Sequence, residues 1–123
     1  MKTLQKSLLA VIASALSLAA DAPSVTGKWN ISLSIGGTDN TLACTFAQKD
    51  SAVTGKCISD NGTVEIAGKV DGNNVAWSYK SEYQGTPLTV KYAGAMVSAS
   101  VIKGSVEVPE YGVTGDFTAN RSE

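Results

Sequence analysis

Two of the residue types most often used in catalysis and metal binding are scarce: the 123-residue chain has two cysteines, Cys44 and Cys57, and no histidine. A paired-carboxylate or Ser-Lys mechanism stays open, but no spacing points to one. Without histidine, the commonest general base and metal ligand near neutral pH is missing, and with it His-dependent triads and zinc sites. No spacing indicates a glycine-rich phosphate loop. Alternation places four carboxylates on outward strand positions or in turns: Glu65, Glu82, Glu107 and Asp116. None is therefore expected in an apolar pocket with a raised pKa, and we expect a non-catalytic protein without cofactor or metal.

The two cysteines occupy inward positions of consecutive predicted strands, 40–48 and 52–59. If Asp50-Ser51 is a two-residue loop, the strand register places Cys44 directly opposite Cys57, close enough to bridge. A disulfide closing a loop of this length is worth roughly 3 kcal/mol in the chain-entropy model. The alternative is two buried free thiols. We expect the disulfide.

Three aromatic residues are the best anchors for a ligand. Trp77 and Tyr79 point inward from one predicted strand and Tyr92 from the next. The alternative is that they fill the barrel together with Phe46 and Phe117. Nearly every inward position is apolar, Gly or Cys, whereas a ligand site normally needs several convergent polar groups. We therefore favour a packed interior, with no room for a guest beside Trp77 and Tyr79, over a small-molecule pocket.

The elements that position these residues are predicted from alternation. From Trp29 to Ile35 apolar and polar residues alternate, which is typical of a strand with one buried face. Eight such strands are predicted, over residues 25–35, 40–48, 52–59, 63–70, 74–81, 88–96, 101–108 and 113–119, with one tight turn near Ser98-Ala99. Short connections predict an all-β, eight-stranded antiparallel up-and-down meander barrel, with a sandwich as the alternative. Trp29 is expected to plug one end.

The first 20 residues have the pattern of a cleaved secretory signal: two lysines, then an apolar run that ends in small residues. A retained helix is the alternative. Residues 21–123 are predicted to form a single β-barrel domain, secreted or periplasmic, with no membrane association after cleavage. Without Lys2 and Lys6 this part has 8 basic and 11 acidic residues, which argues against a nucleic-acid partner.

Short motifs resemble known barrels. Gly27-Lys28-Trp29, Val75-Ala76-Trp77 and Gly115-Asp116-Phe117-Thr118 resemble those of avidin-type proteins. With lipocalins these belong to the wider calycin-type group, and the resemblance implies an eight-stranded barrel able to hold one small ligand. Avidins line their pocket with several tryptophans, whereas this chain has two, so biotin is not the expected ligand.

A second resemblance is to bacterial inhibitors of secreted metalloproteases, which are eight-stranded barrels with an early Gly-x-Trp and one disulfide. Short exported bacterial barrels of unknown role are also similar. We therefore expect an exported binding module, with a small apolar or aromatic ligand slightly favoured. The alternative is a protease inhibitor or protein-interaction barrel that acts through its turns or N-terminal segment. A purely structural role is a third possibility.

Overall fold

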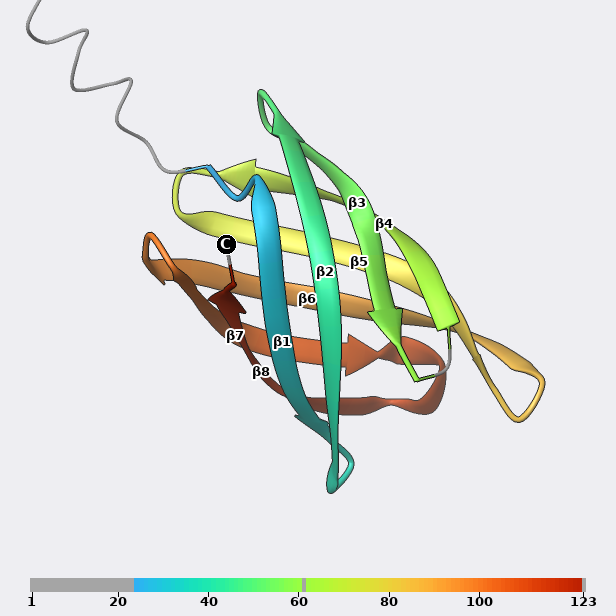
Figure 1. The fold of residues 1–123 in the computed structure, drawn as a ribbon. Helices are drawn as coiled ribbons and strands as arrows, with labels where there is room; N and C mark the ends of the chain where they lie inside the picture. The colour runs from blue at the N-terminus through green and yellow to red at the C-terminus, as the bar shows by residue number, and fades with distance from the viewer. Residues whose placement is uncertain (1–23, 61, 123) are drawn as a thin grey trace, which may run out of the picture.

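The computed structural model describes residues 24–60 and 62–122, and these form one closed antiparallel barrel (Figure 1). Its strands are β1 (Gly27–Ile35), β2 (Thr38–Lys49), β3 (Ala52–Ser59), β4 (Gly62–Asp71), β5 (Asn74–Tyr83), β6 (Thr86–Ser98), β7 (Val101–Val108) and β8 (Val113–Arg121). Each strand pairs with the next, and β8 pairs with β1, so no strand edge is left open. The predicted all-β up-and-down barrel is confirmed. The proposed signal peptide, residues 1–20, lies outside the described residues.

Within the described part of the chain the one helix is a single 3₁₀ turn, η1 (Pro109–Tyr111), between β7 and β8. No helix there is long and apolar enough to cross a membrane. The other connections are tight turns. Gln84 and Gly85, between β5 and β6, have φ angles of 51° and 81°, the positive values that a type I′ hairpin turn requires.

One predicted turn was misplaced. Ser98 pairs with Val101, so the β6–β7 turn is Ala99-Ser100 rather than Ser98-Ala99. The register shifts between Met96 and Ser98. Such a bulge adds a residue to one strand, which simple alternation cannot anticipate. β6 is therefore longer than its sequence pattern indicates.

Inward glycines let the strands coil closely beside large rings. A Cβ atom on Gly68 would lie 2.7 Å from the Cα and Cβ atoms of Trp77. A Cβ atom on Gly94 would lie 2.9 Å from the Cζ atom of Phe117. Since real Cβ contacts are longer than this, a larger residue at either position would displace a core ring or a neighbouring strand.

The disulfide predicted from strand register is present. Lys49 pairs with Ala52 across the β2–β3 turn, and this register brings Cys44 opposite Cys57. Their sulfur atoms are bonded, and the two Cα atoms are 4.0 Å apart. Both residues are buried. A bond of this kind indicates folding in an oxidising environment, because disulfides form and persist there.

We expect the Cys44→Ala, Cys57→Ala variant to lose roughly 3 kcal/mol of unfolding free energy, since the bond restricts the unfolded chain. Urea denaturation of the variant and of wild type should measure this loss. Reduction should raise the intact mass of wild type by two hydrogens. Two thiols that react with an alkylating agent in the native, unreduced protein would contradict the assignment.

Trp29 plugs the end of the barrel where β1 begins and β8 ends. Its side chain is fully buried, and its indole Nε1 donates a 2.9 Å hydrogen bond to the carbonyl oxygen of Val25. The Arg121 guanidinium lies 4.4 Å from the centroid of the Trp29 ring. Arg121 also donates hydrogen bonds to the carbonyl oxygens of Thr26 and Ser24, both 2.7 Å long. The last strand thereby fixes the segment that precedes the first.

The predicted start of β1 at Val25 was wrong by two residues, because β1 begins at Gly27. The backbone N–H of Val25 donates to the Gln48 side chain, and its carbonyl accepts the Trp29 indole N–H. These two bonds take up the backbone N–H and carbonyl groups of Val25 in place of pairing with a neighbouring strand. Val25 therefore folds over the Trp29 end as a buried apolar cap instead of extending the strand.

We expect Trp29→Ala to cost about 3–5 kcal/mol of unfolding free energy, as is usual when a buried aromatic ring is deleted. Chemical denaturation should show this as a lower transition midpoint. The matched control is Ile58→Ala on β3, whose side chain is 57% exposed and whose loss should cost less than about 0.5 kcal/mol. Full stability of the Trp29 variant would show that this ring is not a structural plug.

Candidate functional site

The barrel interior is filled with aromatic rings on the side of Trp29. Phe46 lies 6.5 Å from Trp29 and 5.0 Å from Trp77, measured between ring centroids. Trp77 stacks on Tyr92 at 4.9 Å with an interplanar angle of 11°, and Phe117 contacts both rings edge-on. Trp77 is 2% exposed and Tyr92 1% exposed. The packed surroundings that we predict for Trp77 are therefore present.

Tyr79 ends this aromatic stack. Its ring is half-buried and lies 5.8 Å from that of Tyr92, and the two hydroxyl oxygens share a hydrogen bond of 2.9 Å. Burial raises the pKa of both hydroxyls, and the neighbouring Tyr79 raises that of Tyr92 further. Two neutral hydroxyls carry two hydrogens, and their mutual bond uses one. The hydroxyl that accepts this bond therefore still has an O–H to offer.

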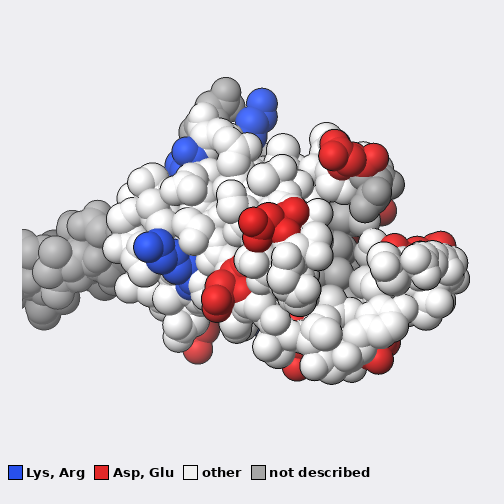
Figure 2. Space-filling view, turned by 90° about the horizontal axis from the view of Figure 1, so that it is seen from below, with Lys and Arg blue, Asp and Glu red and all other residues white. Residues whose placement is uncertain are grey.

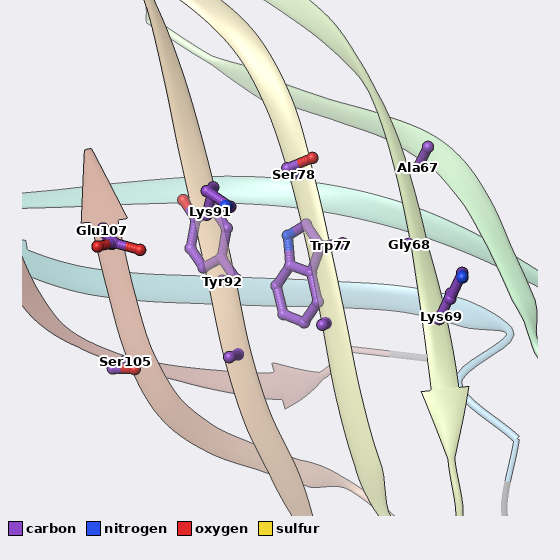
Figure 3. A pocket seen from close by; sticks show the side chains of 11 residues that line it. Ala67, Gly68, Lys69, Trp77, Ser78, Lys91, Tyr92, Ser105 and Glu107 are labelled. Atoms are coloured by element: carbon purple, nitrogen blue, oxygen red, sulfur yellow. The ribbon is translucent and has the colours of Figure 1, made fainter. Parts of the chain in front are cut away.

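A second donor lies beside the stack. The Nε1 atom of Trp77 is buried and has no hydrogen-bond partner among the described residues. Figure 3 shows this nitrogen and the Tyr92 hydroxyl on the same side of the two stacked rings, toward Ser78 and Lys91. Tyr79 follows Ser78 on β5, so this is the Tyr79 side. A buried N–H left unpaired costs about 1–3 kcal/mol, so this layer of the barrel favours a hydrogen-bond acceptor.

Beyond Tyr79 the barrel opens into a cavity of about 860 Å³. Besides Tyr79, its apolar walls are formed by Leu33, Ile35, Leu42, Val64, Leu88, Val90, Val108 and Val113. Leu33, Leu88, Val90 and Val108 are 7–9% exposed, compared with 0–3% for the rings of the filled half. The volume and the mostly apolar lining fit a small-molecule site. The cavity exists because the inward residues of this half are aliphatic rather than aromatic.

The cavity mouth is formed by turns and by η1. Tyr83, at the end of β5, and Tyr111, in η1, are 59% and 47% exposed. Their ring centroids lie 6.3 Å apart with an interplanar angle of 87°. Both rings line the mouth, together with the carboxylate residues Asp39, Asp60 and Glu82.

Glu110 ties η1 to the barrel wall. Its carboxylate accepts hydrogen bonds from the backbone N–H of Thr89 at 3.0 Å and from the Thr89 hydroxyl at 2.9 Å. The Thr89 backbone bond is the largest cause that lowers the pKa of Glu110. Since Glu110 precedes Tyr111, these bonds hold the Tyr111 ring at the mouth.

A smaller hollow of about 330 Å³ lies over the outer face of β4 to β7 (Figure 3). Small outward side chains, those of Ala67, Ala76 and Ala93, contribute to its lining. Trp77 and Tyr92 also contribute to its lining, but both are buried residues whose rings pack inside the barrel, so the hollow is a weaker candidate than the cavity. Among residues 24–60 and 62–122 no group of His, Cys, Asp and Glu side chains could hold a metal ion.

The structure brings the three predicted ligand residues together, but in different roles. Trp77 and Tyr92 are buried beneath the cavity, and of the three only Tyr79 lines it. Binding of a ligand by them stays a prediction. The prediction of a packed interior is wrong for the half beyond Tyr79, which holds the cavity, and the tyrosines at its mouth were not predicted. The sequence signal that could have revealed the cavity is the type of inward side chain, because those beyond Tyr79 are valine, leucine and isoleucine rather than aromatic residues.

We expect the buried tyrosine pair to make stability fall at high pH. The folded pKa of both hydroxyls is raised above the ordinary 10.0, so the unfolded chain ionises first. Their contribution is complete below about pH 10 and is lost as the pH rises, by up to about 1.4 kcal/mol per pH unit for each tyrosine. Urea denaturation across this range should show a shallower loss for Tyr79→Phe, Tyr92→Phe. An equally steep loss in the variant would contradict this origin.

Comparisons with known proteins support the fold alone. No known protein family matches the chain, and no curated protein matches it. Among solved structures it is similar to a redesigned β-barrel, with a TM-score of 0.65 and 15% sequence identity over 80% of this chain and 92% of that chain. At this identity, the similarity shows that the chain has a β-barrel fold and shows nothing about its ligand.

Proposed function

We propose that this protein is an exported, non-catalytic barrel that binds one small apolar or aromatic molecule in the cavity beyond Tyr79. The cavity itself carries the proposal. An eight-stranded barrel can be filled by its own side chains or hold one small ligand, and this chain leaves about 860 Å³ unfilled. Leaving so much apolar wall uncovered costs stability, which a ligand that covers it would recover.

The polar groups around the cavity support binding rather than catalysis. Tyr79 is the hydroxyl-bearing residue at its deep end, and its pKa is raised by burial, which keeps it neutral at physiological pH. A neutral hydroxyl can orient a ligand through a hydrogen bond. General acid–base catalysis instead favours a group whose pKa lies near the working pH.

Export is supported by two features. The Cys44–Cys57 disulfide fits an oxidising compartment, and residues 1–20 have the composition of a secretory signal. Secretion or release into a periplasm would meet both conditions. The resemblance to avidin- and lipocalin-type barrels fits a ligand held inside the barrel.

The alternative, a protease inhibitor that acts through its N-terminal segment, has less support. Among the described residues of that segment, Ser24 to Thr26 lie against the barrel and are bonded to Arg121 and Gln48. Inhibition through a projecting segment would leave this stretch free. The turns at the cavity mouth remain available to a protein partner.

The test is fluorescence titration with N-phenyl-1-naphthylamine, a neutral apolar dye. We expect enhanced emission on binding to wild type and at least about tenfold weaker binding to Val64→Trp, in which the added ring occupies the cavity. The matched control is Val97→Trp, because Val97 is 60% exposed and does not line the cavity. Absence of dye binding to folded wild type, or equal weakening by both variants, would contradict the proposal.

A further inference from the structure

We infer that the ligand of this cavity carries a positively charged organic group, a quaternary or protonated amine, which binds at the mouth between Tyr83, Tyr111 and the rim carboxylates. The inference rests on the proposed function and adds the chemical class of the ligand. The apolar part of such a molecule would lie against the aliphatic walls.

The charge at the mouth is of one sign. The charged residues that line the cavity are Asp39, Asp60 and Glu82, and none of its lining residues is a lysine or arginine. Figure 2, which views the barrel from the side of the β1–β2 turn, shows Asp and Glu side chains around the hollowed part of this face and Lys and Arg side chains outside it. Low-dielectric walls beside an acidic rim strengthen the attraction of a cation and repel an anion.

The aromatic rings supply a second, independent feature. Four large apolar or aromatic side chains of the described chain are strongly exposed, and two of them, Tyr83 and Tyr111, meet at this mouth. Their rings are nearly perpendicular, so a guest beside the pair can contact the face of at least one ring. Ring faces attract ammonium groups, and aromatic cages are a recurrent way to bind quaternary ammonium ligands.

The basic group near η1 does not neutralise this rim. Lys80 Nζ donates a 2.9 Å hydrogen bond to the Thr89 hydroxyl, which in turn donates to Glu110. Lys80 and Glu110 do not line the cavity. The positive charge of Lys80 thus lies beside the Glu110 carboxylate and leaves the three lining carboxylates for a ligand.

The test compares three ligands that share one tail, octyltrimethylammonium, octanol and octanoate, as competitors of N-phenyl-1-naphthylamine. All are used well below micelle-forming concentrations. We expect the cation to bind wild type about tenfold more tightly than octanol, and octanoate to bind most weakly. In Tyr83→Leu, Tyr111→Leu the preference for the cation over octanol should fall to about threefold or less, because leucine offers an apolar surface but no ring face to an ammonium group.

Glu82→Gln should reduce the same preference, and the matched control Glu65→Gln, on the outer face of β4, should leave it unchanged. Equal binding of octanol and the cation, or tighter binding of octanoate, would overturn the inference and leave the proposed function standing. Failure of the dye itself to bind would remove both. An unchanged preference in the double tyrosine variant would overturn the role of the two rings.

Discussion

The width of a closed eight-stranded barrel is the constraint on which the interior depends. Once β8 pairs with β1, the diameter is set by the strand number, and the inward side chains alone decide whether the space is filled. Between Trp29 and Tyr92 those side chains are large rings in mutual contact. Beyond Tyr79 they are aliphatic, and the same diameter leaves a cavity.

The two ends of the barrel therefore have different structural roles. Trp29 pairs directly with Cys44, so the disulfide lies beside the plugged end and strengthens the half that is already packed. Arg121 fixes the cap over that end through the Ser24 and Thr26 carbonyls. A well-packed, cross-linked half offsets the stability that the hollow half lacks. Because the mouth is made of turns, substitutions there can change its shape with little effect on the stability of the rest of the barrel.

The features that could be predicted from the sequence are those that depend on local residue patterns. Alternation of apolar and polar residues identified the strands, and the short Asp50-Ser51 loop gave the register that joins Cys44 to Cys57. The bulge beyond Met96 escaped prediction because a bulge breaks the alternation of inward and outward residues by which a strand is recognised. The cap formed by Val25 also escaped prediction, since its backbone N–H bonds to the side chain of Gln48, which is distant in the chain.

The cavity was missed for a different reason. Alternation tells which side chains point inward, but filling depends on their summed volume at each level of the barrel, which requires the three-dimensional stagger of the strands. The pairing of Tyr83 with Tyr111 joins β5 to η1 across the mouth and has no local signature. Trp77, Tyr79 and Tyr92 could be predicted to point inward together, whereas the boundary between filled and hollow halves at Tyr79 could not.

Burial also determines where charge can lie along the cavity. The low polarity that raises the pKa of Tyr79 and Tyr92 would equally penalise a charged group of a ligand placed at their level. The donor there, a tyrosine hydroxyl hydrogen, is neutral and suits an uncharged acceptor. The carboxylates lie at the mouth, where water lowers the cost of their charge. For a ligand with one charged end, desolvation would therefore act in the same direction as the acidic rim, placing the charge outward and the neutral part toward Tyr79.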